Sequence, residues 1–388
     1  MLEVPEICTI SPTLAETMRE CLLRAGLSRA SGSSNFVLGN PKAWLGTAYH
    51  EVLEKIVDVD LRDESLDDAV ERLWNQAIAD QEIRTTVHAF NHRFGSPVAW
   101  PGYHLARASV LLRATELSGA IPFGVSDRTP QASEIQSAGA LREHDFTAFA
   151  GRLIGRPDVI RAGRVVDYKS GAILERDDAT QTSVVKAAYG RQLRIYGYLV
   201  RQALGWWPQY GILLPLGGAG VEVALEPSEC EREANEALAL LISYEARLQE
   251  ASVPTDLASP SPNGCRWCPF KLVCPSFWQT ASPSWSGELD GASVEGVVVE
   301  KPALTHGGTA RALTLDIQAG SEMPRRAQIA PLNPATHPTV TALAAGDRVR
   351  LVGLRARTDG VLVPTQRTVL ARVIDLPSIT LAADRVHK

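Results

Sequence analysis

The chain has 388 residues, 45% of them apolar, and a formal net charge of −5. This length is enough for two domains or one elaborated domain, and the acidic balance excludes a protein that binds nucleic acid over its whole surface, so any affinity for phosphates has to come from a local groove. The sequence has no run of eighteen apolar residues, no signal-peptide pattern in residues 1–6 and no GxxxxGK(S/T) motif, which favours a cytoplasmic protein without a membrane contact or a P-loop motor of its own.

The first third of the chain is predicted to be helical. Ser11 followed by Pro12 marks the start of a first helix, because apolar residues recur at helical spacing after it. Residues 41–59 form a second predicted helix, which carries His50. Residues 65–118 are rich in Ala, Leu, Arg and Glu and predict an inserted helical subdomain, broken near residues 95–102.

Three strands are predicted next, at 131–141, 146–160 and 164–169. Asp158 lies near the end of the second strand, whereas Asp167 and Lys169 are two apart on the third and therefore project from one face. Two carboxylates that share a divalent cation beside a lysine can split a phosphodiester, because the cation polarises the phosphoryl oxygen and acidifies a bound water. His50 is a candidate third ligand, although a lone helical histidine is usually a packed or surface residue.

A predicted amphipathic helix at 183–204 carries a second pair of polar side chains. Gln192 and Tyr196 are four residues apart and share one face of it. Beside a metal site such a pair can orient the lysine and hold a phosphate or a base; the alternative is a plain amphipathic helix with Tyr196 in the core. A hairpin at 207–214 and 220–225 and a helix at 227–250 follow, so the whole predicts an α/β core with a small sheet.

The cysteines are unevenly placed. Cys265, Cys268 and Cys274 form a C-x2-C-x5-C run, which predicts metal or cluster ligation rather than disulfides in a chain without an export signal. Cys21 is the favoured fourth ligand, with Cys8 as the alternative. Ligation by thiolates alone fits either Zn²⁺ or an iron–sulfur cluster.

The composition changes after the cysteine run. Residues 276–292, rich in Ser, Pro, Trp and Gly, predict a linker, and short strand-like runs at 294–300, 312–318, 348–357, 360–364 and 369–374 predict a small closed β-barrel that is OB-like or SH3-like. Residues 281–388 have a net charge of +2, against −7 for the rest. We expect the arginines of 348–357 to face outward, where they can contact a nucleic-acid backbone. Residues 293–388 contain no Trp, Tyr or Phe, which argues against base stacking on the barrel.

Taken in order, these motifs resemble the RecB-like branch of the PD-(D/E)XK nucleases, which includes the RecB and AddB nuclease domains and the CRISPR-associated adaptation nucleases with an iron–sulfur cluster. The pattern is a Ser-Pro start followed by a Cys, then G-x3-H, G-x2-D, acid-x-Lys, Q-x3-Y and C-x2-C-x5-C. The matching residues are Ser11, Pro12, Cys21, Gly46, His50, Gly155, Asp158, Asp167, Lys169, Gln192, Tyr196, Cys265, Cys268 and Cys274. The resemblance covers roughly residues 7–278.

The resemblance implies a role for each of these side chains. The residues implied to act in catalysis are Asp158, Asp167, Lys169, Gln192 and Tyr196. The ligands implied for Mg²⁺ or Mn²⁺ are His50, Asp158 and Asp167, assisted by the backbone carbonyl of Tyr168. The ligands implied for a structural 4Fe–4S cluster, in preference to zinc, are Cys21, Cys265, Cys268 and Cys274.

We therefore expect a PD-(D/E)XK restriction-endonuclease-like nuclease domain with a helical insertion at 1–275, a linker at 276–292 and an OB-like barrel at 293–388. The expected activity is hydrolysis of DNA, on single strands or ends, in recombination, repair or phage defence. The alternative is a nuclease-fold DNA-binding subunit that acts mainly as a structural partner in a helicase complex. The barrel is a departure from the family pattern; it would either feed single strands to the site or dock a partner such as a helicase. RNA cleavage and a zinc-stapled fold also stay open.

Overall fold

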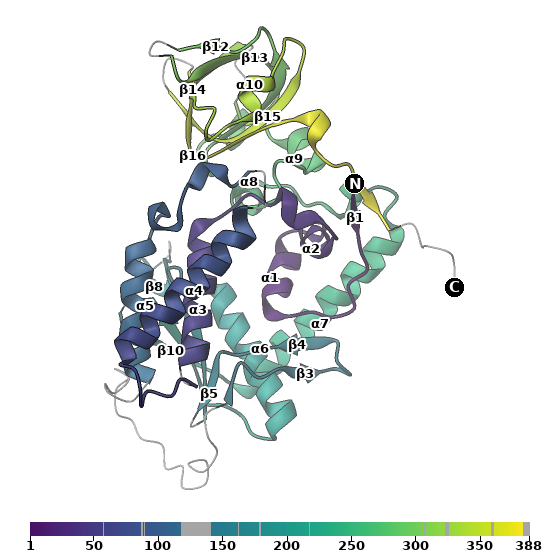
Figure 1. Cartoon of the computed structure of the whole chain (residues 1–388). Helices are drawn as coiled ribbons and strands as arrows, with labels where there is room; N and C mark the ends of the chain where they lie inside the picture. Colours follow the sequence, from purple (N-terminus) through teal and green to yellow (C-terminus); the bar gives the residue numbers. More distant parts are fainter. Residues whose placement is uncertain are drawn as a thin grey trace.

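The computed structural model describes residues 1–56, 58–86, 88, 90–117, 141–161, 163–177, 180–216, 218–305, 308–322, 326–357 and 361–382. Within these residues a larger N-terminal part of helices and a sheet carries a β-barrel at one end (Figure 1). The strand expected at 131–141 lies outside the described residues except for Leu141. In the described part of the chain, no helix combines the length and apolar character needed to cross a membrane.

A five-stranded sheet in the order β10-β9-β6-β5-β2 forms the centre of the N-terminal part. Its strands are β2 (Leu141–Arg142), β5 (Val159–Arg161), β6 (Arg164–Lys169), β9 (Tyr210–Pro215) and β10 (Val221–Ala224). β6 pairs antiparallel with β5 and parallel with β9. The predicted hairpin after residue 206 is confirmed as β9 and β10, which pair antiparallel.

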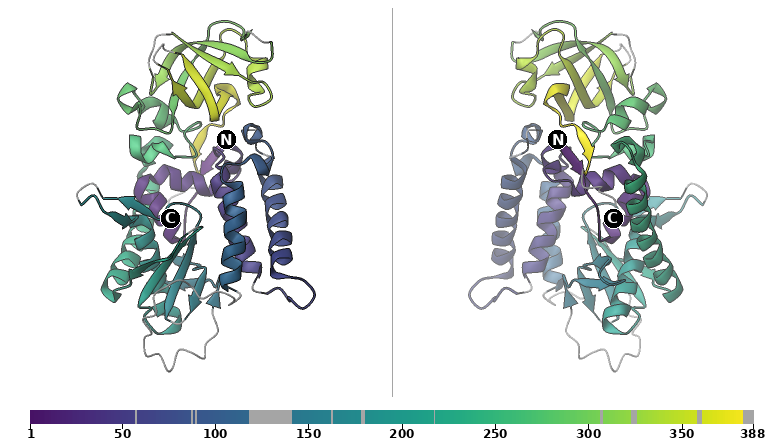
Figure 2. Two further views of the ribbon diagram at one scale, coloured as in Figure 1. Left: turned by 90° about the vertical axis from the view of Figure 1, so that its left-hand side faces the viewer. Right: turned by 90° about the vertical axis from the view of Figure 1, so that its right-hand side faces the viewer.

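Helices cover both faces of this sheet (Figure 2). On one side lie α3 (Pro41–Ile56), α4 (Leu66–Thr86) and α5 (Tyr103–Leu117), with short 3-10 turns at the predicted break between α4 and α5. On the other side lie α1 (Pro12–Glu20), α2 (Leu22–Arg29), α6 (Ala187–Leu204) and α7 (Pro227–Glu250). Side chains along β6 alternate between the two faces of the sheet. Val165 lies in the core under α6, whereas Tyr168 lies in the core under α3.

The predicted strand at 146–160 is wrong as a single element. The structure has β3 (Phe146–Ala148) and β4 (Leu153–Gly155) as a separate hairpin before β5. The physical reason is a tight turn in which Phe149, Ala150 and Gly151 all have positive φ, followed by Pro157, which has no N–H to give to a ladder. A second hairpin pairs β7 (Leu174–Arg176) with β8 (Ser183–Val185). The first residues of the helix predicted at 183–204 are therefore a strand, and the helix begins after it.

The segment expected as a linker has structure of its own. It contains α9 (Pro275–Thr280) and a 3-10 turn at Pro283–Trp285, preceded by α8 (Pro262–Arg266). Phe277, Trp278 and Trp285 are buried in a cluster that also includes barrel residues, so this segment packs the barrel against the N-terminal part. A parallel pair of β1 (Leu2–Val4) with β17 (Ile379–Leu381) also joins the two parts.

The barrel closes through five strands. Its sheet runs β11-β15-β16-β14-β13, and β13 pairs back onto β11. The strands are β11 (Ala292–Val298), β13 (Arg311–Gly320), β14 (Arg326–Leu332), β15 (Arg348–Ala356) and β16 (Leu362–Arg372); β12 (Ala303–Leu304) extends the edge, and α10 (Thr339–Ala342) precedes β15. The strand that contains Pro331 is missed by sequence reasoning, and two predicted short strands are one long strand, β16.

The expectation that all arginines of β15 face outward is wrong for Arg350. Its side chain is 13% exposed and its Nε donates to Glu295 Oε2 at 2.6 Å, while its Nη1 donates to Leu272 O at 2.9 Å. Glu295 is itself almost fully buried in β11 and also pairs with Arg348. Arg350 is therefore a bridge between the barrel and the N-terminal part, because a buried carboxylate needs a charged partner.

Candidate active site

Two adjacent strands of the central sheet place the acidic residues. Asp167 and Lys169 project from β6 on the face that packs under α6, as the alternation predicts. Asp158 lies immediately before β5, and its Oδ2 accepts a hydrogen bond from the backbone N–H of Tyr168 at 2.5 Å. The β6 backbone thus fixes one carboxylate while carrying the other.

Lys169, Gln192 and Tyr196 form a hydrogen-bonded chain with Asp167. Lys169 Nζ donates to Gln192 Oε1 at 2.9 Å and contacts Asp167 Oδ2 as an ion pair. Gln192 Nε2 donates to Asp167 Oδ1 at 3.2 Å and to Tyr196 Oη at 3.0 Å. Gln192 and Tyr196, four residues apart on α6, therefore hold both the lysine and the carboxylate in place. Lys169 also lies over the Tyr189 ring, 4.8 Å from its centre.

His50 reaches the site from α3, and Glu143 from the end of β2. His50 Nδ1 is 3.5 Å from Asp158 Oδ1. In the β2–β5 ladder Arg142 pairs with Val159, which sets Glu143 opposite Asp158, and Glu143 N donates to Asp158 O at 3.1 Å. Over the described residues, one set of three His, Cys, Asp or Glu ligand atoms lies within 4.8 Å of one another, and it is His50, Glu143 and Asp158.

Glu143 was missed by the sequence reasoning, which named Asp167 as the third member of the metal set. Asp167 lines the same cavity as His50 and Asp158, but its Oδ2 faces Lys169. Glu134, a further acid within the strand predicted at 131–141, lies outside the described residues. In the sequence, Glu143 is an acid two residues after the strand predicted at 131–141. Only the register between β2 and β5 brings it to Asp158.

Burial and the neighbouring charges shift the pKa values of the acidic side chains and of His50. Burial raises the pKa of Glu143 to about 7, and the charges of Asp158 and Glu54 act in the same direction. Burial raises the pKa of Asp167 to about 6, although the Lys169 ammonium lowers it. Burial opposes protonation of His50, but the hydrogen bond and charge of Asp158 outweigh it and raise the His50 pKa. Such a site holds excess protons that a divalent cation could replace.

Two glycines explain why the helices can approach this closely. A Cβ at Gly155 would lie 2.5 Å from Leu199 Cδ1 and 3.1 Å from Tyr196 Cε1, so the absence of a side chain lets α6 lie against β4. A Cβ at Gly46 would lie 2.8 Å from Ser170 Cβ. The glycines of the G-x2-D and G-x3-H motifs are therefore packing requirements of the two helices that carry Tyr196 and His50.

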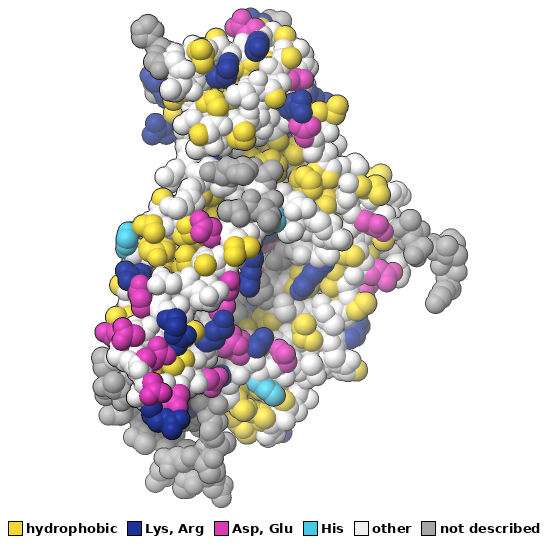
Figure 3. All heavy atoms as spheres, in the orientation of Figure 1, with side chains coloured by type: hydrophobic (Ala, Val, Ile, Leu, Met, Phe, Trp, Pro, Cys, Tyr) yellow, Lys and Arg dark blue, Asp and Glu magenta, His cyan; other side chains and the backbone are white. Residues whose placement is uncertain are grey.

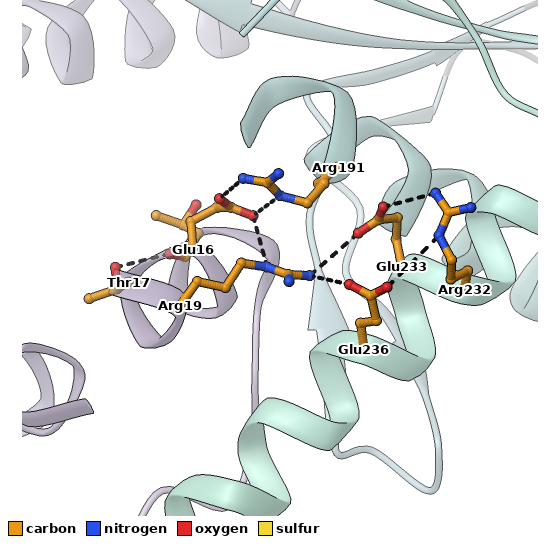
Figure 4. Close-up of polar contacts among 8 residues, drawn as sticks. Glu16, Thr17, Arg19, Arg191, Arg232, Glu233 and Glu236 are labelled. Atoms are coloured by element: carbon orange, nitrogen blue, oxygen red, sulfur yellow. Dashed lines mark hydrogen bonds and ion pairs between the residues drawn. The ribbon is translucent and has the colours of Figure 1, made fainter. Parts of the chain in front are cut away.

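The side chains surround a cavity of about 400 Å³. Its far wall is the start of α1, where Glu16 accepts two hydrogen bonds from Arg191, the neighbour of Gln192 (Figure 4). Arg19 of the same helix pairs with Glu233 and Glu236 of α7. This network holds α1 against α6 and α7 and so fixes one wall of the cavity.

The donor set suits a hard divalent cation. Carboxylate oxygens and one imidazole are ligands that Mg²⁺ and Mn²⁺ accept. Asp167 Oδ2 is buried and makes no hydrogen bond, although Lys169 contacts it as an ion pair. A buried carboxylate next to other acids fits a cation site, because negative charges buried together need positive charge beside them.

The four predicted cluster ligands also meet. Cys21, Cys265, Cys268 and Cys274 line one pocket where the break between α1 and α2 faces the cysteine run. Burial raises the pKa of Cys268 to about 12 and that of Cys274 to about 11, as expected for thiols packed without a cation. Of the two thiols weighed for the fourth place, Cys21 lies in this pocket, whereas Cys8 is exposed and does not line it. Soft thiolates in this number suit zinc or an iron–sulfur cluster.

Comparison with known proteins gives a family match over more than half of the chain. A family model described as the PD-(D/E)XK nuclease superfamily matches residues 9–275. A solved structure described as a candidate exonuclease, from Eubacterium rectale, is 11% identical, with a TM-score of 0.35 over 62% of this chain and 82% of that one. The structure of SSO0001 is 19% identical, with a TM-score of 0.22 over 45% of this chain and 76% of that one. No curated protein is significantly similar to the chain.

Proposed function

Because this chain belongs to the PD-(D/E)XK nuclease superfamily, we propose that it is a metal-dependent deoxyribonuclease that hydrolyses phosphodiester bonds. The observation that carries the proposal is the meeting of His50, Glu143 and Asp158 beside the Asp167–Lys169–Gln192 chain in one cavity. The half-buried Lys169 ammonium is held at the Asp167 carboxylate by Gln192, which favours an active site over an inactive nuclease fold. This set is what hydrolysis at a phosphate requires: acids for a cation and a positioned positive charge.

In this proposal His50, Glu143, Asp158 and Asp167 hold Mg²⁺ or Mn²⁺, which supplies polarisation of the phosphoryl oxygen and acidification of an attacking water. Lys169 stabilises the negative charge that develops at the phosphate or orients the water. Gln192 keeps Lys169 and Asp167 at a fixed separation, and Tyr196 fixes Gln192. The donors stand ready before substrate arrives, so little reorganisation is needed in the transition state.

The direct test is cleavage of end-labelled single- and double-stranded DNA with Mg²⁺ or Mn²⁺. Lys169→Ala should abolish cleavage without loss of fold, and EDTA should abolish it in the wild type. Lys55→Ala is a matched control, since Lys55 pairs with Glu51 on the exposed side of α3. Activity that survives Lys169→Ala would refute the catalytic assignment. No cleavage by a folded wild-type protein would favour the alternative, a DNA-binding subunit within a helicase complex.

We also propose that the four-cysteine pocket holds a 4Fe–4S cluster, as in the RecB-like branch of the superfamily. No three of these described sulfurs lie within 4.8 Å of one another. Thiolates on one tetrahedral zinc ion with 2.3 Å bonds are only about 3.8 Å apart. The wider spacing favours a cluster, which would staple α1 and α2 to a loop about 240 residues later in the chain. Anaerobically prepared protein should absorb near 400 nm and contain iron; zinc alone would contradict the proposal.

The strand order supports an OB-like assignment of the barrel. Numbered along the chain, its five strands pair 1-2, 2-3, 3-5, 5-4 and 4-1, and the pair β14–β16 is parallel. α10 lies between the third and fourth strands, and such barrels commonly bind oligonucleotides. We propose domain boundaries at 1–275 and 293–388, and a role for the nuclease at single strands or DNA ends in cytoplasmic recombination, repair or phage defence.

A further inference from the structure

A groove of about 950 Å³ lies where the barrel meets the N-terminal part. One wall consists of the start of α3 and the cysteine run, and the other consists of β15 and β16. Six lysine or arginine side chains and two carboxylates line it, in a chain whose net charge is −5. The groove is therefore positive within an acidic protein, which is the local source of phosphate affinity that the overall charge does not provide.

An exposed tryptophan stands at this groove. Trp267 is 58% exposed, whereas the other seven tryptophans of the chain are buried or half-buried. It lies between Cys265 and Cys268, and the guanidinium carbon of Arg367, from the barrel, is 5.2 Å from its ring centre. An exposed indole ring beside positive charge is the arrangement on which bases of single strands stack. The barrel has no aromatic residue, so the cysteine run supplies the stacking surface that the barrel lacks.

The basic side chains differ in how they are engaged. Arg367 is paired with Asp290. Lys42, Arg266 and Arg355 are exposed, and among the described residues none of them contacts a carboxylate. Arg266 lies 5.4 Å from the Trp267 ring centre and is free to move from the ring to a phosphate when a base takes its place. Charges without a carboxylate partner suit contacts with a polyanion.

The groove is close enough to the active site to serve it. Pro41 and Lys42 at the start of α3 line the groove, and His50 lies two turns further along the same helix. At 1.5 Å per residue the distance along the axis is about 14 Å, the rise of roughly four stacked nucleotides. On the face drawn in Figure 3, the N-terminal part is hollowed below the barrel, and Lys and Arg side chains lie around the hollow together with Asp and Glu side chains.

We propose that this groove binds a single-stranded segment of the DNA substrate next to the scissile bond. Trp267 stacks on a base, and Lys42, Arg266 and Arg355 contact phosphates. The inference rests on the proposed nuclease function but concerns a separate set of residues. It assigns the barrel a role as one wall of a strand-binding groove, and it predicts preference for substrates with an unpaired segment over blunt duplexes.

Binding of a fluorescein-labelled single-stranded 20-mer, followed by anisotropy in EDTA, tests the groove without hydrolysis. Trp267→Ala should weaken binding roughly 5- to 150-fold, and Trp267→Phe should retain most of the affinity because it keeps a stacking face. Arg355→Ala should reduce the slope of log affinity against log salt by about 0.7. Arg161→Ala removes the same charge from the exposed end of β5 and should leave the slope unchanged.

Two further measurements keep the interpretation clear. Visible absorbance of the Trp267 variants shows whether the neighbouring cysteine site is intact, so that a binding loss with unchanged absorbance supports stacking. Cleavage by the wild type with Mg²⁺ is measured separately. Binding that depends on Trp267 without cleavage would support the groove and contradict the nuclease proposal. Cleavage by the wild type, with DNA affinities unchanged in Trp267→Ala and Arg355→Ala, would refute DNA binding in the groove. The groove would then be a candidate binding surface for a protein partner.

Discussion

Gly46→Ala tests how closely α3 packs against the strand that carries Lys169. The added Cβ would lie 2.8 Å from Ser170 Cβ and closer still to Ser170 Oγ, where an ordinary contact is 3.4 Å or more. Overpacking of this kind costs about 1–3 kcal/mol, whereas the better helix propensity of alanine returns about 1 kcal/mol. The free energy of unfolding should therefore fall by up to about 2 kcal/mol. Cleavage should fall further, since a 1 Å displacement beside Lys169 can cost about 100-fold.

Ser170→Gly supplies the decisive background. Apart from the adjacent residues and the backbone of α3, no other atom of the described residues lies within 4 Å of the added Cβ, so removing the Ser170 side chain removes the clash. In that background Gly46→Ala should become stabilising by up to about 1 kcal/mol. Urea unfolding of the four proteins gives the coupling energy, and cleavage rates report on Lys169. Equal effects of Gly46→Ala in both backgrounds would refute the packing argument.

Three further outcomes are expected. Without metal, the free energy of unfolding should fall as the pH rises from about 4.5 to 7, because Glu143 has a pKa of about 7 in the folded protein and loses its proton at lower pH in the unfolded chain. Urea titrations at several pH values should show a smaller fall for Glu143→Gln. An equal fall in the variant would contradict the raised pKa of Glu143. Cys268→Ser should remove the absorbance near 400 nm and lower the free energy of unfolding. Cys230 is buried outside the four-cysteine pocket, so Cys230→Ser should retain the absorbance. Equal spectra of the two variants would exclude the cluster. Arg350→Met should destabilise the junction between the barrel and the N-terminal part by about 2–4 kcal/mol, because the buried Glu295 carboxylate loses one of its charged partners. Proteolysis within residues 275–292 should therefore become faster. Unchanged proteolysis would argue against the bridging role of Arg350.

Much of the fold follows from local patterns. The Ser11 cap, with its side chain accepting from Leu14 N, begins α1 where the sequence predicts it, and α3, α7 and the β9–β10 hairpin lie close to their predicted bounds. These elements are set by caps and periodicity, which act over a few residues. The juxtaposition of Asp167 and Lys169 also follows from the sequence, since alternate residues of one strand share a face.

Other features depend on contacts between distant segments. Glu143 reaches Asp158 only because β2 pairs with β5 in one register, and a shift of one residue would turn it to the other face. Arg350 faces inward because Glu295 of another strand is buried beside it. The predicted linker is instead a packed junction, since Phe277 and Trp278 find apolar partners in the barrel.

The sequence by itself determined which residues could act, because acid-x-Lys, Q-x3-Y and C-x2-C-x5-C place chemically matched groups within a few residues of each other. The tertiary structure decided which of them meet. It brings Glu143 next to His50 and Asp158, places Cys21 rather than Cys8 in the cysteine pocket, and sets Trp267 against Arg367 of the barrel. The physical reason is range: caps, alternation and helical spacing act locally, whereas registers and packing between layers depend on the whole chain at once.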